Sequence, residues 1–102
     1  MSDLSQEEWA IQIKEDTNGV ILDVRTLEEV ENGVIGDPVH HDIYNPQAFM
    51  QALQGLDKSK NYYVYCRSGN RSGQACAIMK SLGFTNAYNL TGGLVEWKGE
   101  LS

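Results

Sequence analysis

Two things are scarce in this 102-residue sequence, namely cysteine and long apolar runs. No stretch approaches the ~18 apolar residues that a membrane-spanning helix needs, which argues against a membrane protein. The opening MSDLSQEEWA lacks the basic and apolar regions of a secretory signal, so we expect a cytoplasmic protein with reduced thiols. Two cysteines in such a chain fit one reactive thiol and one buried bystander better than a disulfide.

Acidic residues are absent between Lys58 and Val95. Twelve of the fourteen carboxylates precede Lys58, whereas six of the eight lysines and arginines lie at or after it. The net charge of −6 argues against nucleic acid and anionic membrane surfaces as partners. Cys66 lies inside the acid-free stretch, and cationic surroundings lower the pKa of a thiol. Such an uneven distribution of charge along the sequence can arise by chance, and the charges of the two halves can lie side by side in the folded protein. The distribution therefore favours a reactive Cys66 only together with the loop around it.

The sequence predicts a single domain spanning residues 1–102, without repeats or linkers. Apolar periodicity predicts helices over 3–16, 26–32, 45–56, from about 71 to 82, and a short one within 92–100. Expected helix caps are Ser5 with Glu8, Thr26 with Glu29, and Asn45. Short apolar runs predict strands at 19–24, 61–65 and 86–90, with an ambiguous one at 39–43. Because strands and helices alternate, we expect an α/β fold with a parallel sheet.

One loop combines the residue types of a reactive-cysteine site. Cys66 follows the strand NYYVY, and open α/β sheets bind ligands at the carboxyl ends of their strands. The next helix begins near Arg71–Ser72, so its N-terminal N–H groups point back toward the loop. Gly69 and Asn70 let the backbone curl, so that consecutive N–H groups converge on one anion. We predict that this anion is the Cys66 thiolate, activated without a histidine partner.

The two histidines are poorly placed to assist this cysteine. His40 and His41 are adjacent, and adjacent residues of a strand point to opposite faces. We expect them to have surface or packing roles, with no metal site and no cofactor. A Cys–His hydrolase is therefore disfavoured.

Loop length separates the two kinds of chemistry that suit a cysteine surrounded by amides, phosphoryl transfer and sulfur transfer. Four residues lie between Cys66 and Arg71, whereas cysteine-dependent phosphatases have five before an arginine that forks onto the phosphoryl group. The shorter loop suits a single extra sulfur atom, only ~2.05 Å beyond the cysteine sulfur. Arg67 and Arg71 favour an anion-binding role over the alternative of solvated surface charges.

Three segments together resemble the single-domain rhodanese family, the thiosulfate sulfurtransferase-like domains. They are ILDVRTLEEVENG (21–33), YVYCRSGNRSGQACAIMKSLGF (63–84) and AYNLTGGLVEWK (87–98). The resemblance covers nearly the whole chain. It implies a rhodanese-like α/β fold with a mostly parallel five-stranded sheet and helices on both faces.

The resemblance also implies roles for particular residues. Cys66 is the implied nucleophile, which carries the transferred sulfur as a persulfide. The implied cradle for that sulfur is the active-site loop of Arg67, Ser68, Gly69, Asn70 and Arg71. Asp23 and Arg25 are implied to be structural. Cys76, next to the apolar face of the following helix, is expected to be a buried hydrophobe rather than a resolving thiol.

The implied activity is sulfur transfer from a donor such as thiosulfate to cyanide, a small thiol or a protein thiol. Two alternatives stay open. One is a sulfur-relay or regulatory module that acts with a protein partner and turns over small donors poorly. The other, disfavoured by loop length, is a cysteine phosphatase or arsenate reductase.

One segment departs from the family pattern Gly-His-Ile-Pro-Gly-Ala. Val34 replaces the histidine, and the proline comes later, at Pro38. This departure puts the local backbone and any partner contact there in question, but it leaves the cysteine loop untouched.

Overall fold

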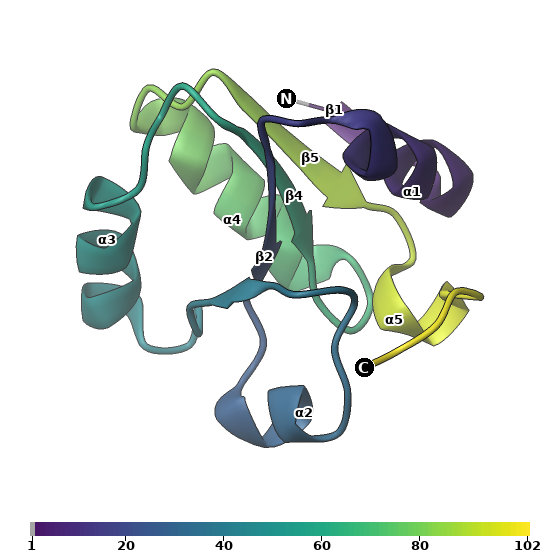
Figure 1. Cartoon of the computed structure of the whole chain (residues 1–102). Helices are drawn as coiled ribbons and strands as arrows, with labels where there is room; N and C mark the ends of the chain where they lie inside the picture. Colours follow the sequence, from purple (N-terminus) through teal and green to yellow (C-terminus); the bar gives the residue numbers. More distant parts are fainter. Residues whose placement is uncertain (1) are drawn as a thin grey trace.

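A five-stranded parallel sheet forms the centre of the computed structural model, which describes residues 2–102 (Figure 1). The strands lie in the order β1-β5-β4-β2-β3, and each neighbouring pair is parallel. Their bounds are β1 Ser2–Leu4, β2 Gly19–Asp23, β3 Val39–His40, β4 Asn61–Tyr65 and β5 Asn86–Leu90. The predicted α/β fold with a five-stranded sheet is confirmed, and the sheet is parallel throughout rather than mostly parallel.

Helices cover both faces of the sheet. Within residues 2–102 they are α1 Gln6–Glu15, α2 Leu27–Glu31, α3 Pro46–Gln54, α4 Asn70–Ser81 and α5 Gly93–Glu96. Figure 1 shows α3 and α4 on one side, α1 and α5 on the other, and α2 beyond the carboxyl ends of the strands. Because all strands run the same way, the loops that follow β2, β4 and β5 meet at this end, where α/β sheets bind ligands.

The central strand β4 divides two apolar cores. Alternate side chains of a strand point to opposite faces, so its residues are shared between both cores. Tyr62, Val64 and Cys66 belong to the core under α3 and α4, and Tyr63 and Tyr65 belong to the core under α1 and α5. Trp9 anchors the second core: it is fully buried, and its ring meets those of Tyr63 and Tyr65 edge-on. The strand that leads to Cys66 is therefore held rigidly on both sides.

The first strand is the main correction to the sequence prediction. The helix expected over 3–16 begins instead at Gln6, because the residues before it pair with β5. The expected capping box is present, since the N–H of Glu8 donates to Ser5 Oγ at 3.2 Å and the N–H of Ser5 donates to Glu8 Oε1 at 3.3 Å. A three-residue segment is too short to show the alternation that would distinguish it from the start of a helix.

Three other boundaries differ slightly. Asn45 occupies the N-cap of α3, but within the described chain its side chain makes no capping hydrogen bond there. The α4 helix begins at Asn70, one residue before the expected start. The ambiguous strand over 39–43 is reduced to Val39–His40, although the N–H of His41 still donates to Asp23 at 3.0 Å.

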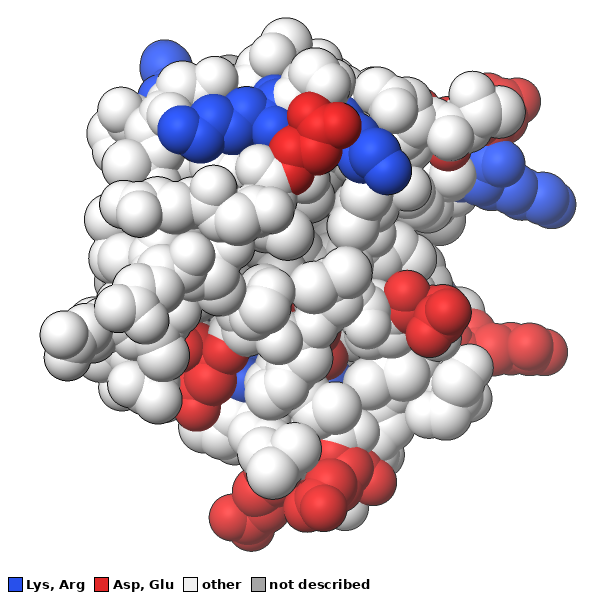
Figure 2. Space-filling view, turned by 60° about the vertical axis from the view of Figure 1, so that its left-hand side comes forward, with Lys and Arg blue, Asp and Glu red and all other residues white. Residues whose placement is uncertain are grey.

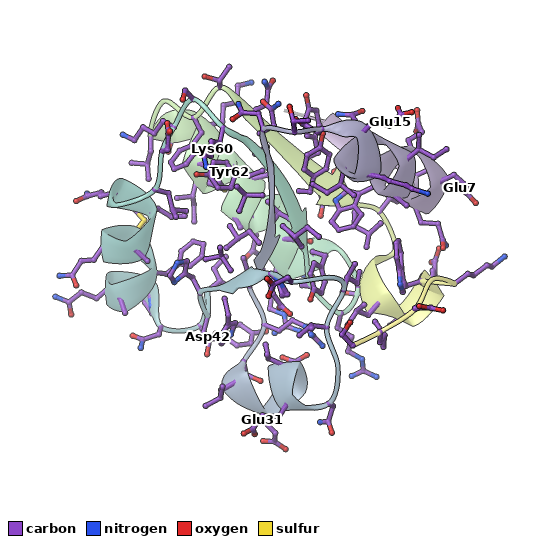
Figure 3. The ribbon with its side chains drawn as sticks, in the orientation of Figure 1. Glu7, Glu15, Glu31, Asp42, Lys60 and Tyr62 are labelled. Carbon is purple, nitrogen blue, oxygen red and sulfur yellow. The ribbon has the colours of Figure 1, made fainter. Side chains whose placement is uncertain are left out.

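The two ends of the sheet differ in charge. Figure 3 shows Lys60 and Tyr62 where β4 begins and Glu31 at the opposite end, on α2. Figure 2, seen from the side of α3, shows basic and acidic atoms together toward the first end and mostly acidic atoms toward the second. The strand ends that carry Cys66 therefore lie near an acidic helix. No helix in residues 2–102 has both the length and the apolar character to cross a lipid bilayer.

Candidate active site

Cys66 comes directly after the last residue of β4 and four residues before α4 begins. Its side chain lies in the core between these two elements and has 0% exposure. The position follows from the alternation along β4, which directs Val64 and Cys66 to the same face of the sheet. The sulfur is thus placed at the carboxyl end of the sheet, as the sequence predicts, but it is enclosed rather than open to solvent.

Hydrogen-bond donors converge on the Cys66 sulfur. The N–H of Gly69 donates to Sγ at 3.1 Å, and the N–H of Ser72 does so at 3.4 Å. The hydroxyl of Ser72 also lies 3.4 Å from Sγ, but its single proton is shared between Sγ and the nearer acceptor, Asn89 Oδ1. The Ser72 N–H belongs to the first turn of α4, where N–H groups lack helical partners and carry partial positive charge.

These donors decide the ionisation of Cys66. Burial alone raises the pKa of its thiol, but hydrogen bonds from the Ser72 hydroxyl and from the N–H groups of Ser72, Ser68 and Gly69 outweigh burial and lower it. The pKa of Cys66 therefore lies below the ordinary value of a cysteine. A larger thiolate fraction makes a cysteine a better nucleophile near neutral pH.

Two glycines allow this arrangement. Gly69 has φ +95°, a left-handed conformation that lets its N–H turn toward the sulfur. Gly93 of α5 lies against the start of the loop, where a Cβ atom would come within 2.5 Å of the Arg67 carbonyl oxygen. This close approach lets the N–H of Leu94 donate to Cys66 O at 3.1 Å and the N–H of Val95 donate to Arg67 O at 2.9 Å. The loop is therefore fastened to α5 through its backbone.

Asn89 on β5 links the two donors of the sulfur. Its Nδ2 donates to Gly69 O at 3.1 Å and to Asp3 Oδ1 at 2.9 Å. Because both acceptors are on the Nδ2 side, the Oδ1 faces Ser72 and accepts from its hydroxyl. Sequence analysis missed Ser72, Asn89 and Asp3, whose contacts depend on elements distant in the chain. The available signal was a polar side chain at a buried position of a short strand, where it needs partners.

The guanidinium of Arg71 is paired with a carboxylate of α2. Its NH1 and NH2 groups donate to Glu29 Oε1 and Oε2 at 2.7 and 2.8 Å, which is a two-point ion pair. The guanidinium also lies 5.1 Å from the centre of the Tyr44 ring. The Cys66 loop comes from a stretch of sequence without acidic residues. In the folded protein, Arg71 of this loop nevertheless contacts Glu29, a carboxylate from the acidic first half of the chain.

The five predicted loop residues lie in different surroundings. Gly69 faces the sulfur, Arg71 is paired with Glu29, and the other three have exposed side chains, namely Arg67, Ser68 and Asn70. Ser72, one position beyond the predicted loop, supplies its N–H and a hydroxyl whose proton Sγ shares with Asn89. The immediate surroundings of Sγ thus consist of backbone N–H groups and one hydroxyl rather than charged side chains.

A sequence model of the Rhodanese-like domain matches residues 6–100. The chain belongs to the rhodanese-like domain family. It is 36% identical over 89 residues to YtwF of Bacillus subtilis (strain 168), whose name contains the word sulfurtransferase, and the match covers 87% of this chain and 82% of YtwF. It is 35% identical over 97 residues to a tRNA uridine(34) hydroxylase of Legionella pneumophila (strain Corby), which covers 92% of this chain but 38% of that protein.

Solved structures agree with the family assignment. The crystal structure of a rhodanese-like domain protein from Staphylococcus aureus superimposes with a TM-score of 0.84 at 27% identity, covering 100% of this chain and 97% of the other. The resemblance recognised from the three sequence segments is therefore confirmed, together with the fold that it implies.

In this rhodanese-like chain, Asp23 and Arg25 join β2 to the segment around α2. Arg25 contacts both carboxylate oxygens of Asp23, with a shortest distance of 2.7 Å, and it donates to Gly33 O at 2.7 Å. Both residues are buried, so each charge depends on the other. This pair supports the backbone beside the Cys66 loop.

The segment that departs from the rhodanese pattern pairs with the end of the chain. Val34, at the position of the family histidine, exchanges two backbone hydrogen bonds with Ser102, at 3.1 and 2.8 Å. The N–H of Ile35 donates to the Tyr65 hydroxyl at 3.0 Å, and Gly36 turns the chain with φ +65°. The departure is thus accommodated by local pairing that involves no residue of the Cys66 loop.

The histidines border a different part of the rhodanese-like fold. His40 Nε2 lies 2.6 Å from Arg25 O, and burial and the neighbouring His40 lower the pKa of His41. Both line a surface cavity of about 150 Å³ between the β3 segment and α3. Among residues 2–102, no group of three or more His, Cys, Asp or Glu side chains is arranged to hold a metal ion.

Proposed function

We propose that this chain is a sulfurtransferase in which Cys66 carries the transferred sulfur as a persulfide. The observation that supports this most strongly is the convergence of the Gly69 and Ser72 donors on Sγ, which favours a negative charge there. Membership of the rhodanese-like family and the name of YtwF agree with this chemistry.

The proposed reaction has two displacement steps. The Cys66 thiolate attacks the outer sulfur of a donor such as thiosulfate, the donor S–S bond breaks, and sulfite leaves with the bonding electron pair. An acceptor nucleophile (cyanide, a small thiol or a protein thiol) then attacks the outer persulfide sulfur and regenerates the thiolate. No external oxidant or reductant is needed. Because the free thiolate and the persulfide form of the enzyme alternate, one in each half-reaction, we expect ping-pong kinetics.

The enclosure of Cys66 adds an opening step to this cycle. With 0% exposure, Sγ is reached only after a covering group moves. We assign this movement to residues 67–70, because Arg67, Ser68 and Asn70 have exposed side chains. A small movement suffices for a donor that presents one sulfur atom at its tip.

The phosphatase alternative gains no support from the loop. A phosphatase arginine forks onto the phosphoryl oxygens, but here both ends of the Arg71 fork are taken by Glu29. The relay alternative shares Cys66 with the main proposal and differs only in the donor and acceptor. Turnover of small donors therefore separates the two.

Intact mass spectrometry tests the proposal. The protein is incubated with thiosulfate without reductant, and we expect a gain of one sulfur atom that Cys66→Ala abolishes. Cys76→Ala is the matched control, because it removes the other buried cysteine and should leave the gain unchanged. A gain that survives Cys66→Ala, or wild-type protein that gains sulfur from neither thiosulfate nor a persulfide, contradicts the proposal.

A further inference from the structure

The cation nearest the start of α4 is unavailable to a substrate. Arg71 places both ends of its guanidinium on Glu29, and each N–O distance is shorter than 3 Å. This two-point geometry satisfies the charge of Arg71 more fully than a single contact would. An anionic donor that approached Cys66 would have to compete with a carboxylate already in place.

Glu29 also accepts hydrogen bonds from Thr26, the N-cap residue of its own helix. Its Oε1 accepts from the N–H of Thr26 at 3.1 Å and from the Thr26 hydroxyl at 3.1 Å, as part of the capping box of α2. The hydrogen bonds from Arg71 lower the pKa of Glu29 to about 2, so the carboxylate is ionised at every working pH. The ion pair is therefore a fixed feature of the site and does not open by titration.

Once the Arg71–Glu29 pair is counted as neutral, Arg67 on the loop and Glu28 on α2 remain as exposed charges of opposite sign. Arg67 is exposed, and the structure records no ion pair for it among residues 2–102. The first turn of α2 carries Glu28 beside Glu29. A donor with two negative charges meets one free arginine and a neutralised one.

We propose that Glu29 is a specificity-determining residue, which neutralises Arg71 and thereby selects singly charged sulfane-sulfur donors over doubly charged ones such as thiosulfate. The inference rests on the proposed function and extends it to the donor. The biological class that fits is a persulfide of a small or protein thiol. Its outer sulfur passes to Cys66, and the bonding electron pair leaves with the donor thiolate.

The test compares two donors that differ in charge. Thiosulfate carries two negative charges, and methanethiosulfonate carries one on a similar sulfonyl group. In Glu29→Gln, Arg71 regains an unpaired charge, while glutamine still serves as the capping residue of α2. We expect kcat/KM for thiosulfate to rise about tenfold and that for methanethiosulfonate about threefold, because the attraction scales with donor charge.

Matched variants exclude other causes of the gain. Glu28→Gln removes the same charge one residue away, from an exposed side chain for which the structure records no partner among the described residues, so it should change kcat/KM less than twofold. In Glu29→Gln/Arg71→Gln the gain over Arg71→Gln should vanish. Raising the ionic strength should also reduce the gain in Glu29→Gln, since screening weakens the attraction. A structural defect would produce none of these increases.

The outcomes separate this inference from the proposed function. If wild-type Cys66 accepts sulfur but Glu29→Gln shows an equal or lower kcat/KM for thiosulfate, the specificity role of Glu29 is wrong and sulfur transfer stands. If Glu28→Gln gives the same gain, net charge rather than Arg71 is responsible, and the inference is also wrong. If wild-type Cys66 is loaded by neither of these donors nor by a small-thiol persulfide, both proposals fail together.

Discussion

The two cysteines of this chain are both buried, yet their surroundings drive their ionisation in opposite directions. Cys66 has 0% and Cys76 1% exposure, and both belong to the same apolar core. Burial raises the pKa of Cys76 to about 12, whereas the pKa of Cys66 is lowered by donors from Gly69 and Ser72. Hydrogen bonds to the sulfur, rather than exposure, therefore separate the pKa values of the two thiols.

The largest expected difference is in alkylation by iodoacetamide at pH 7. We expect Cys66 to react faster than Cys76 by on the order of a thousandfold, because the thiolate is the reacting species and Cys76 is almost wholly protonated. Peptide mapping of the alkylated protein measures both rates in one sample. Comparable rates, or prior labelling of Cys76, would remove the basis of the comparison.

Ser72→Ala should raise the pKa of Cys66 toward that of Cys76. It removes the hydroxyl beside Sγ and keeps the N–H of residue 72. A hydrogen bond to a charged group contributes about 1.5 kcal/mol or more, so we expect about a tenfold slower alkylation of Cys66 at pH 7. Ser81→Ala, at the far end of α4 and bonded to Ile78 O, is the control and should leave the rate unchanged. Equal rates in the two variants would show that the hydroxyl is not a significant donor.

Asn89→Ala should have a smaller effect of the same kind. Asn89 Nδ2 holds the Gly69 carbonyl, and Asn89 Oδ1 competes with Sγ for the single proton of the Ser72 hydroxyl. Its removal loosens the Gly69 donor but frees the Ser72 proton for Sγ, so the two effects partly offset. We expect about a threefold loss of alkylation rate and a pH–rate profile displaced toward higher pH. Asn86→Ala removes an asparagine from the same strand that is bonded to Asn61, away from the loop. Its profile should match that of wild type. An unchanged profile in Asn89→Ala would assign Asn89 to stability alone.

The raised pKa of Cys76 should lower the stability of the fold at alkaline pH. A group with a raised pKa in the folded state stabilises the fold below its unfolded pKa, and this stabilisation is lost as pH rises toward the folded value. For Cys76 the loss runs from about pH 9 to about pH 12. At pH 10 this loss of stability amounts to about 1 kcal/mol. The unfolding free energy of Cys76→Ala should therefore fall by about 1 kcal/mol less between pH 8 and pH 10 than that of wild type. Urea titrations of both proteins measure it, and identical pH dependence would contradict the buried, protonated state.

The parts of the fold that follow local patterns were predictable from sequence. The apolar run before Cys66 predicted a buried strand, and Ser5 and Thr26 predicted helix starts that the structure confirms. Three residues of β1 carry no comparable pattern, and their extended conformation depends on pairing with β5 across the whole length of the chain. Asparagine is a common helix-capping residue, but the side chain of Asn45 does not make the expected capping hydrogen bond.

The contacts that complete the candidate site lay beyond sequence reasoning for a different reason. Arg71 and Glu29 are 42 residues apart, and no local rule pairs them. Ser72 could have been noticed as the next residue of a helix N-terminus, but the value of its hydroxyl depends on Asn89, which lies on another strand. Sequence spacing indicated which sulfur the loop surrounds and gave no information on which donors the tertiary fold brings to it.

The short strand β1 has a practical consequence. Its Asp3 contacts Asn89, which in turn contacts the hydroxyl beside the sulfur, so the amino end of the domain is mechanically connected to the thiol. Protein tags or fusion partners joined ahead of residue 2 would therefore be expected to perturb reactivity without touching the loop itself. Assays that compare donors should use protein whose amino end is the same in every sample.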